Sequence, residues 1–476
     1  MLADHPPRSA EEAAETALDP QPPSPRVGPD AAAGEAPGGT IPAWDGTARS
    51  ANGAARATAA DAFGPLLAAL FPDGIPVQFR FWDGSAAGTG DGPGAVVVRS
   101  NNALRRVLWA PGDLGFGRAV VAGDLDFEGD LFLVLRALQD AVPERDLRLG
   151  ARAARGVLES STRVGALGRP LPPPPEEITP RGWRHSKRRD ARAISHHYDV
   201  GNDFYRLVLG PSLTYSCARF VDVGTSLEDA QASKHELVCQ KLGLPQQRGA
   251  RLLDIGCGWG SMALHAATEH GAKVVGVTIS QEQAELARRR VAEAGMAEQV
   301  EIRLQDYRDL GGEQFDAISS IGMFEHVGSE RTKQYFETAL SLLRPGGRFL
   351  NHAISSKGGS RLGGRSFLGR YVFPDGELLD VGDVVLDMHA AGFEVRDVES
   401  LREHYARTLR AWIANLEAHW DEAVALVGVG RARIWRLYMA ASAVGFEDGG
   451  VSVHQVLTVR PEPGGRSRMP AVRTWN

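Results

Sequence analysis

The stretch 251–260, RLLDIGCGWG, constrains the fold more than any other part of the chain. An apolar run ends at Asp254 and is followed by three alternating glycines, Gly256, Gly258 and Gly260. Glycine permits positive φ angles and lets a ligand approach the backbone closely. The spacing differs from the G-x-G-x-x-G of a dinucleotide-binding turn. The segment therefore predicts a strand that leads through a glycine turn into a helix and holds a ligand at that turn.

The segments after this turn alternate between helical and strand patterns. SMALHAATEH is typical of a helix, and AKVVGVTIS of a second apolar strand suited to a sheet buried on both faces. Further strands are expected in VEIRL, in FDAISSI and after the Pro-Gly turn of LLRPGGRFLNHAIS. Strands that alternate with helices through short turns indicate an α/β fold with a doubly wound parallel sheet, which binds its ligand at the carboxyl ends of the strands.

The residues at the strand ends predict the kind of ligand. No acid follows the second strand to accept both ribose hydroxyls, so a ribose would be held by the neutral groups of Thr278, Ser280 and Gln283. After the third strand, Asp306 could accept from an adenine amine, and Tyr307 could lie against the purine. Because D-x-G-x-G-x-G resembles the first motif of class I S-adenosylmethionine methyltransferases, we expect their Rossmann-like fold and a ligand without phosphates.

Composition argues against several classes of protein. At 476 residues with 43% hydrophobic content, the chain is long enough for roughly two or three domains with real cores. The net charge of −6 gives no indication of a nucleic-acid partner. Cys217, Cys239 and Cys257 have no C-x-x-C spacing, so neither a metal site nor a disulfide framework is expected. No apolar run approaches the roughly 20 residues of a membrane span, and no signal peptide is evident, so we expect a cytoplasmic protein.

Shifts in composition predict five regions. The first is rich in Ala, Pro, Gly and Asp without periodicity, which is typical of disorder. The second is a smaller α+β domain with strands in VQFRFWDG and AVVVRS and a helix from Phe127 to Leu138. The regions are a disordered tail (1–58), an N-terminal lipid-associated domain (59–150), a Pro-rich and basic linker (151–190), a methyltransferase domain (191–462) and a flexible C-terminal tail (463–476).

A basic stretch at 181–192, RGWRHSKRRDAR, follows the stiff run LPPPP. Asp190 is the only acid among its lysine and arginine residues. Such a stretch suits the headgroups of an anionic phospholipid bilayer, with Trp183 at the interface. The alternative is a solvated linker helix. We therefore expect peripheral contact with the inner face of the membrane, through this stretch or through the N-terminal domain.

Seven motifs occur in an order that resembles one enzyme family. They are HYDVGNDFY, TYSCARF, LLDIGCGWG, GVTISQEQ, QDYRDL, GMFEHVG and HAISS. Together they are similar to the cyclopropane-fatty-acid and mycolic-acid cyclopropane synthases, over about Ile194 to Val459. The segment from Asp61 to Leu149 is similar to the N-terminal domain of the longer bacterial members that act on phospholipids.

The resemblance implies methyl transfer from S-adenosylmethionine to the cis double bond of an unsaturated acyl chain. An alkene is a poor nucleophile, so an apolar channel must align it with the methyl group and exclude water. Transfer leaves a carbocation, which the aromatic faces of Tyr198, Phe204, Tyr205 and Phe324 would stabilise unless these residues are plain core. Loss of a proton from the new methyl group gives a cyclopropane, whereas loss from a neighbouring carbon leads to a methylene or methyl-branched chain.

The resemblance also implies a bound bicarbonate as the base that takes this proton. Glu325 would accept the proton from the anion, and imidazole and phenol donors would orient it. The matching positions are Glu325, His352, Ile354 and Tyr405, together with Cys217 through its backbone. Ser442 stands where family members often carry a cysteine, so a covalent thiolate has no nucleophile there. The residues expected to contact the donor are Tyr215, Ser216, Asp254, Gly256, Cys257, Gly258, Trp259, Gly260, Thr278, Ser280, Gln283, Gln305, Asp306 and Tyr307.

Several alternatives stay open at this point. The phrase GGRSFLGRYVFPDGELLDVG and the Ala/Arg/Gly-rich composition resemble actinobacterial members, whose tuberculostearic branch makes 10-methylene and, with a partner reductase, 10-methyl chains. No residue decides between a cyclopropane and a methylene product, and a homodimer is left open. A small-molecule methyltransferase and a non-catalytic lipid-binding protein are the other candidates. A nucleic-acid methyltransferase is disfavoured because GMFEHVG lacks the Pro-Pro-aromatic loop that grips a flipped base.

Overall fold

The computed structural model describes residues 58–141, 158–159, 161–162, 165–166, 168–178, 200–361 and 366–475. The predicted disordered tail before Thr58, the basic stretch 181–192 and most of the linker lie outside this part of the chain. Within the described residues, no helix is both long enough and apolar enough to cross a bilayer.

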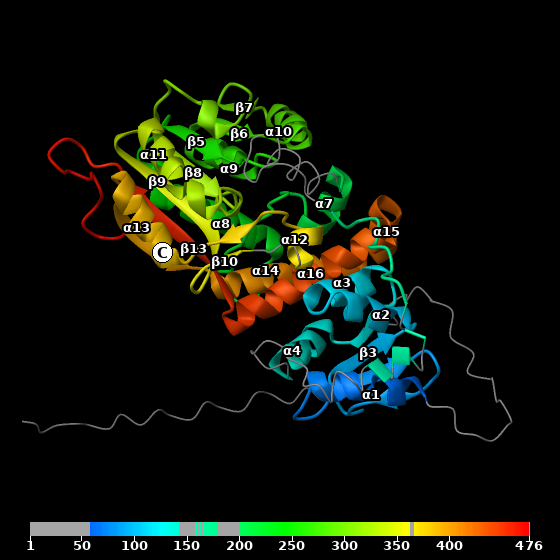
Figure 1. The fold of residues 1–476 in the computed structure, drawn as a ribbon. Coiled ribbons are helices and arrows are strands. Elements are labelled where there is room, and N and C mark those ends of the chain that lie inside the picture. Colours follow the sequence, from blue (N-terminus) through cyan, green and yellow to red (C-terminus); the bar gives the residue numbers. More distant parts are fainter. Residues whose placement is uncertain are drawn as a thin grey trace, which may run out of the picture. The chain divides into compact units, whose positions relative to one another are not determined.

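A seven-stranded sheet forms the centre of the C-terminal part of the chain (Figure 1). Its order is β12-β13-β9-β8-β5-β6-β7, and the five strands from β9 to β7 run parallel. The predicted doubly wound α/β fold is therefore confirmed, although β13, which runs antiparallel between β9 and β12, was not predicted. The strands are β5 (Arg251–Ile255), β6 (Lys273–Thr278), β7 (Val300–Leu304), β8 (Phe315–Ile321), β9 (Leu343–Ser356), β12 (Glu394–Ser400) and β13 (Val451–Val459).

Helices cover both faces of this sheet. Successive residues of a strand face opposite layers, so a strand buried on both sides needs an apolar residue at almost every position. In β5, Leu252 packs into the apolar cluster of α8, α9 and α10, whereas Leu253 packs into that of α11 and α13. The helices are α8 (Leu227–Leu242), α9 (Ser261–His270), α10 (Gln281–Glu293), α11 (Thr332–Leu342) and α13 (Val381–Ala391), of which α9 is the predicted SMALHAATEH helix.

Two element boundaries differ from the predictions. Strand β9 already begins at Leu343, so the predicted Pro-Gly turn lies inside a strand whose register against β8 is irregular. The predicted helix from Phe127 was placed too early, because Phe127 belongs to β4 (Leu125–Gly129) and α4 (Leu131–Ala141) begins after it. The Oδ1 atom of Asp130 accepts from the amides of the second and third residues of α4, which fixes the start of the helix there.

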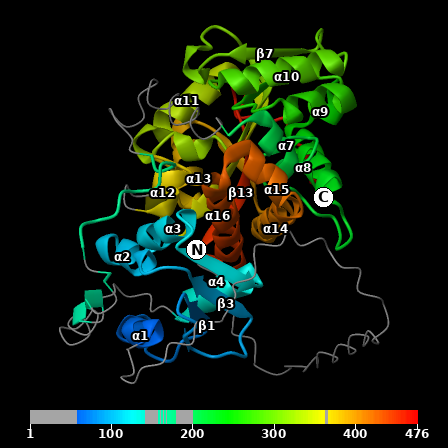
Figure 2. The ribbon, with the colours of Figure 1, turned by 90° about the vertical axis from the view of Figure 1, so that its right-hand side faces the viewer.

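The part of the chain predicted to be an N-terminal domain contains a small sheet of order β2-β1-β3-β4. Its two predicted strands are confirmed as β1 and β3. Helices α3 and α4 contact the long helix α16 (Val429–Asp448) of the C-terminal part (Figure 2). Arg136 of α4 pairs there with Glu447. The elements before β4 are α1 (Ala59–Leu70), β1 (Gln78–Phe81), β2 (Ala86–Ala87), β3 (Gly94–Val98), α2 (Asn102–Trp109) and α3 (Asp113–Val121).

A further group of helices, from segments before and between strands of the sheet, packs into another apolar cluster. Their apolar cluster is rich in aromatic side chains, and Trp412 and Tyr205 are completely buried within it. These helices are α7 (Asn202–Leu209), α12 (Phe367–Tyr371), α14 (Arg402–Ala418), α15 (Trp420–Val427) and α16, and the short strands β10 (Ser360–Arg361) and β11 (Glu377–Leu378) pair beside α12.

The C-terminal segment, residues 463–476, was predicted to be a flexible tail, which stays a prediction, but the structure shows two contacts near its end. Trp475 is only 6% exposed and packs with the cluster of α8 and α9, and Arg473 pairs with Asp397 of β12. An indole buried against the domain holds the end of the segment in place, a contact that the polar composition of the segment did not reveal.

Candidate active site

The predicted glycine turn joins β5 to α9. Gly256, Gly258 and Gly260 have φ angles of 74°, 54° and 81°, which side chains rarely adopt. A Cβ on Gly256 would lie 3.0 Å from the side chain of Met323, whereas a Cβ on Gly258 would meet nothing within 4 Å. Gly256 therefore allows close packing below the turn, and Gly258 leaves open space for a ligand above it.

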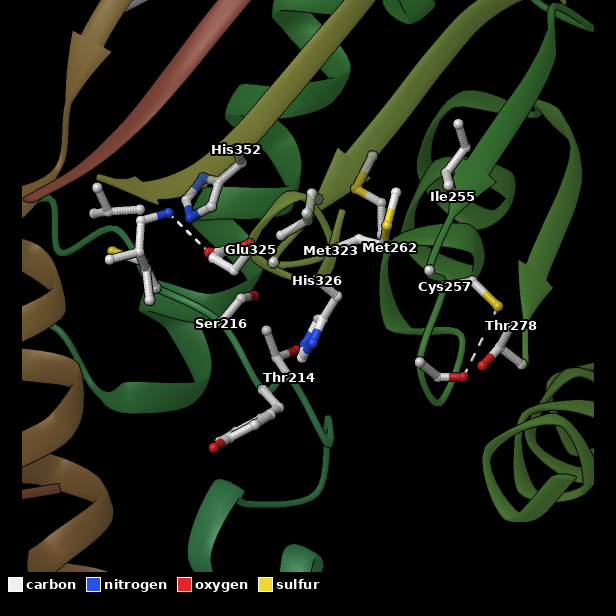
Figure 3. A pocket seen from close by; sticks show the side chains of 18 of the residues that line it. Thr214, Ser216, Ile255, Cys257, Met262, Thr278, Met323, Glu325, His326 and His352 are labelled. Atoms are coloured by element: carbon white, nitrogen blue, oxygen red, sulfur yellow. Dashed lines mark hydrogen bonds between the residues drawn. The ribbon is translucent and has the colours of Figure 1, made fainter. Parts of the chain in front are cut away.

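This turn forms one wall of a cavity of about 260 Å³ (Figure 3). Every predicted catalytic residue lines the cavity, and so does every predicted donor contact except Gly260 and Ser280. Gly260 precedes α9, and a Cβ there would lie 3.4 Å from that of Ala287. The Oγ atom of Ser280 accepts from the amide of Gln283 and caps α10. Gly260 and Ser280 thus serve the starts of two helices instead of lying on the cavity wall.

Asp254 lies near the end of β5, just before the turn, and only one of its two carboxylate oxygen atoms has a hydrogen-bond partner among the described residues. Its Oδ1 atom accepts from Ser319 Oγ at 2.7 Å, while Oδ2 has no partner among the described residues. Burial raises the pKa of Asp254 to about 6, against the lowering effects of Ser319 and Lys234. Close to neutral pH this carboxylate is ionised and has one oxygen atom without a donor. A cationic or hydrogen-bonding ligand at the turn would therefore be attracted to it.

Lys234 of α8 also lines the cavity and was missed by the sequence analysis. Its Nζ atom donates to Ser216 Oγ at 3.0 Å, and the side chain is completely buried. Burial lowers the pKa of this amine to about 8, in spite of the nearby Cys217 and Asp254. The signal was present, because Lys234 shares a helix face with the apolar Leu237 and Val238, where a solvated lysine would be out of place.

The polar residues after β6 and β7 lie at one end of the cavity. Thr278 Oγ1 donates to Gln283 Oε1 at 2.8 Å, and Gln305 Nε2 donates to the carbonyl of Asp309 at 3.0 Å. The carboxylate of Asp306, predicted to face an adenine amine, is engaged by the guanidinium of Arg308 at 2.8 and 2.6 Å. The residues predicted to hold the ribose and adenine are thus gathered together, with Asp306 already paired.

Glu325 and His352 lie on the side of the cavity opposite Cys257 and Thr278 (Figure 3). Glu325 Oε1 accepts from the amide of Ile354 at 2.8 Å, but the buried Oε2 has no partner among the described residues. Burial raises the pKa of Glu325 to about 7, although the amide of Ile354 acts to lower it. Glu325 can therefore exchange a proton near neutral pH, which is the property of a general base.

His352 presents a buried nitrogen atom to the same space. Its Nε2 atom has no partner among the described residues, and Gln455 Nε2 lies 3.3 Å from Nδ1. With the amide in this orientation, Gln455 donates to Nδ1 and leaves the imidazole proton on Nε2. Burial, together with Lys234 and Lys241, lowers the pKa of His352 well below its ordinary value. The imidazole is therefore neutral and suited to donate a hydrogen bond into the cavity.

Tyr405 and Cys217 complete the predicted catalytic set. The ring of Tyr405, on α14, packs against that of Phe446 at a centroid distance of 4.6 Å. Cys217 is completely buried, and burial raises the pKa of its thiol far above the ordinary value. An inert thiol agrees with the expectation that Cys217 contributes its backbone and not a nucleophile. Ser442, expected in place of a family cysteine, lines the same cavity.

Three of the aromatic residues proposed to stabilise a carbocation, Phe204, Tyr205 and Phe324, are described by the structure and do not line the cavity. Phe204 and Tyr205 are completely buried beneath Trp435, and Phe324 stacks on Phe336, so all three belong to the core. Tyr198 lies outside the described residues. The aromatic rings that do line the cavity are those of Tyr215, Trp259, Tyr307, Phe373, Tyr405, Tyr438 and Phe446.

Part of the wall is apolar and comes from segments far apart in the sequence. No local pattern marks these residues as neighbours, which is why the sequence analysis did not find them. They are Leu368 of α12, Leu378 of β11, Leu409 of α14, and Val451 and Val453 of β13. One cavity thus joins a polar end at the glycine turn to an apolar region, with Glu325 and His352 on its wall.

Comparisons with known proteins agree with this geometry. The family described as "Mycolic acid cyclopropane synthetase" matches residues 185–456. The chain is 44% identical over 414 residues to "Probable fatty acid methyltransferase Rv3720" of Mycobacterium tuberculosis, with 84% of the chain and 94% of the relative covered. It is 35% identical over 379 residues to the "Cyclopropane-fatty-acyl-phospholipid synthase" of Escherichia coli K12, with coverage of 78% and 89%.

Solved structures lead to the same family. The mycolic acid cyclopropane synthase CmaA1, solved in complex with SAH and CTAB, superposes with a TM-score of 0.53 at 35% identity. The superposition covers 56% of this chain and 97% of that one. The fold, the glycine turn and the matched residues all lie within the region of similarity, and we conclude that the chain belongs to the mycolic acid cyclopropane synthetase family of S-adenosylmethionine-dependent methyltransferases.

Proposed function

We propose that the chain transfers a methyl group from S-adenosylmethionine to the cis double bond of an unsaturated acyl chain carried by a phospholipid. One observation carries this proposal: the buried Oε2 of Glu325 and Nε2 of His352, without partners among the described residues, line the cavity that also contains the glycine turn and the apolar wall. Such a cavity suits a polar donor, an apolar acceptor and a proton acceptor at the same time.

The apolar wall has a direct role in the proposed step. The π electrons of the alkene form a bond to the methyl carbon, the carbon–sulfur bond breaks, and the sulfonium becomes a neutral thioether. The positive charge moves to a carbon of the acyl chain, where water would capture it. Side chains such as Leu378, Leu409 and Val453 exclude water, and the nearby ring of Phe446 offers the cation an aromatic face.

The proton then released has a defined route to the protein. Glu325, with a pKa of about 7 and a buried Oε2 without a partner among the described residues, is our candidate to accept it. The two unpartnered groups would suit a bicarbonate anion, because His352 Nε2 would donate to it and Glu325 Oε2 would accept from it. When bound, bicarbonate would supply the base next to the acyl carbon. The hydrogen bond from Ile354 to Glu325 holds the carboxylate in place for this relay.

Delivery of the acyl chain is proposed to occur at the inner face of the membrane. A phospholipid-bound chain reaches a buried cavity most easily if the protein stays on an anionic bilayer. The basic stretch 181–192 is our candidate for this contact, and it lies outside the described residues. The product is a cyclopropane or a 10-methylene chain, and a saturated methyl branch would need a partner reductase.

The proposal is tested by expressing the chain in a host whose phospholipids contain oleate. The expected result is a new acyl chain heavier by one CH₂, which chromatography assigns as a cyclopropane or methylene isomer before mass spectrometry. Cells that express Glu325→Gln at the same level are the matched control and should retain unmodified oleate. Unmodified lipids in both strains, with a purified chain that binds S-adenosylmethionine, would contradict the proposal and favour a small-molecule acceptor.

A further inference from the structure

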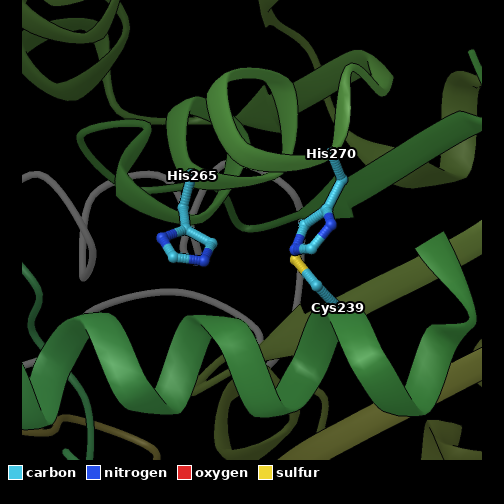
Figure 4. A group of neighbouring side chains, drawn as sticks. All are labelled: Cys239, His265 and His270. Carbon is cyan, nitrogen blue, oxygen red and sulfur yellow. The ribbon is translucent and has the colours of Figure 1, made fainter. Parts of the chain in front are cut away.

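A second group of side chains with metal-binding chemistry lies outside the cavity, between α8 and α9 (Figure 4). Cys239 projects from α8, and His265 and His270 project toward it from α9. None of the three lines the cavity. The sequence has no C-x-x-C spacing and therefore did not indicate a metal site, because these ligands come from two helices that meet only in the fold.

The geometry of the group is close to that of a tetrahedral site. Cys239 Sγ and one ring nitrogen atom each of His265 and His270 lie within 4.8 Å of one another. Glu236, one turn before Cys239, places its Oε2 atom 3.2 Å from Nε2 of His265 and 2.8 Å from Nε2 of His270. Ligands bound at about 2.0–2.3 Å are roughly 3.3–3.8 Å apart in a tetrahedron. Cys239 and the two histidines would therefore approach one another by about 1 Å, and Glu236 would move slightly away from the histidines.

The donor types select the class of metal. One thiolate, two imidazoles and one carboxylate suit a borderline-soft transition metal and do not suit Mg²⁺ or Ca²⁺, which require oxygen ligands. With neutral histidines, the charges of thiolate, carboxylate and a divalent ion sum to zero, which lowers the cost of placing the ion in a partly buried site. The side chain of Glu236 is 35% exposed and that of His265 17%, so an ion can enter from solvent.

We propose that Glu236, Cys239, His265 and His270 bind one Zn²⁺ ion in a structural site. Binding displaces the proton of the Cys239 thiol into solvent and replaces the hydrogen bonds between the histidines and Glu236 by bonds to the ion. Four protein ligands close the coordination sphere, which is the pattern of a structural and not a catalytic zinc site.

The site would stabilise the donor end of the cavity. Helix α8 carries Lys234 and His235, both of which line the cavity, a little more than one turn before Cys239. Helix α9 begins at the glycine turn itself. An ion that joins these two helices would therefore fix the position of Lys234 relative to Gly258, and both residues line the cavity.

Cobalt titration tests the proposal directly. The full-length chain without an affinity tag is stripped with a chelator and titrated with Co²⁺, whose thiolate charge-transfer and visible absorption report a cysteine ligand in a tetrahedral site. We expect one Co²⁺ per chain, displaced by Zn²⁺. Cys239→Ser should lose the charge-transfer band, and His270→Gln should bind at least about tenfold more weakly.

His389→Gln is the matched control, because His389 is an exposed histidine of α13 outside the group. This variant should take up Co²⁺ as the wild-type chain does, and Zn²⁺ should raise the Tm of both proteins but not that of Cys239→Ser. A wild-type chain that shows no stoichiometric uptake or no thiolate band would overturn the proposal, whether or not the variants fold. Undiminished uptake by a folded Cys239→Ser would overturn it too.

Discussion

Glu325→Gln is expected to remove activity and, above neutral pH, to stabilise the folded protein. In the native chain burial raises the pKa of this carboxyl from 4.5 to about 7. The folded state therefore binds the proton more tightly than the unfolded state, and the free energy of unfolding falls as pH rises between these two values. A shift of about 2.5 units corresponds to about 3 kcal/mol, because one unit is about 1.4 kcal/mol. Glutamine cannot ionise, so the variant avoids this loss.

The comparison is designed to isolate ionisation from other effects of the substitution. Unfolding in urea is measured for both proteins at about pH 4.5 and about pH 8, and the difference between them is compared at the two pH values. Any effect of the amide on the free energy of unfolding that does not depend on pH then cancels. Relative to the wild type, the free energy of unfolding of the variant should be up to about 3 kcal/mol higher at the higher pH than at the lower pH. Glu330→Gln, at an exposed position, is the control and should show no such gain.

The same variant should keep its affinity for S-adenosylmethionine and lose at least about a hundredfold in kcat, which is the usual worth of general acid–base catalysis. The wild-type rate should rise with pH through about 7, since Glu325 must be ionised to accept the proton. A variant within about threefold of the wild-type kcat, or with an unchanged dependence of stability on pH, would refute our reasoning about this carboxyl.

Three further results are expected. Gly258→Val should abolish donor binding in calorimetry, because its methyl groups would occupy the open space above the turn. Lys234→Met should weaken donor binding by about tenfold or more and shift its pH dependence upward, since loss of the cation raises the pKa of the neighbouring Asp254 further. Replacing Lys187, Arg188 and Arg189 by Gln should lower cosedimentation with anionic vesicles by at most about a hundredfold, because each charge is worth about 1 kcal/mol.

The first two have a control variant within the chain, and the third is controlled by salt. Gly271→Val introduces the same kind of backbone strain, at a φ angle of 64°, after α9 and away from the cavity, and should keep donor affinity. Lys273→Met changes an exposed lysine and should behave as the wild type does. For the vesicles, added salt should weaken wild-type binding. Donor binding by Gly258→Val at wild-type affinity, or vesicle binding indifferent to both salt and charge, would contradict the respective prediction.

The features that the sequence predicted are those encoded locally. The glycine turn, the parallel strands and helix α9 follow from short patterns, since turn geometry and strand alternation depend on neighbouring residues. Helix α4 was placed too early because Phe127 lies only a few residues before the apolar run from Leu131 to Leu135. Its start depends on the capping of two amides by Asp130, which is visible only once the preceding residues pair as a strand.

The features that were missed depend on contacts between distant segments. Strand β13 pairs with β9 over about a hundred residues of chain, and nothing in its own composition shows that it runs antiparallel between two other strands. The sequence shows that Phe204 and Phe324 are aromatic, but it does not show whether their rings face a cavity or the core. Their packing partners decide this. Cys239 on α8 is likewise separated in sequence from His265 and His270 on α9, and only the packing of the two helices brings them together.

One measurement tests the central claim most directly. The purified chain is incubated with S-adenosylmethionine carrying a ¹³C-labelled methyl group and with anionic vesicles of a phospholipid that bears a cis-unsaturated acyl chain. We predict that the label appears in the acyl chain, on the carbons of the former double bond as a cyclopropane or methylene carbon, and that Glu325→Gln binds the donor without labelling the lipid. A labelled headgroup, or a donor-binding wild-type chain that labels no acyl chain, would contradict our account.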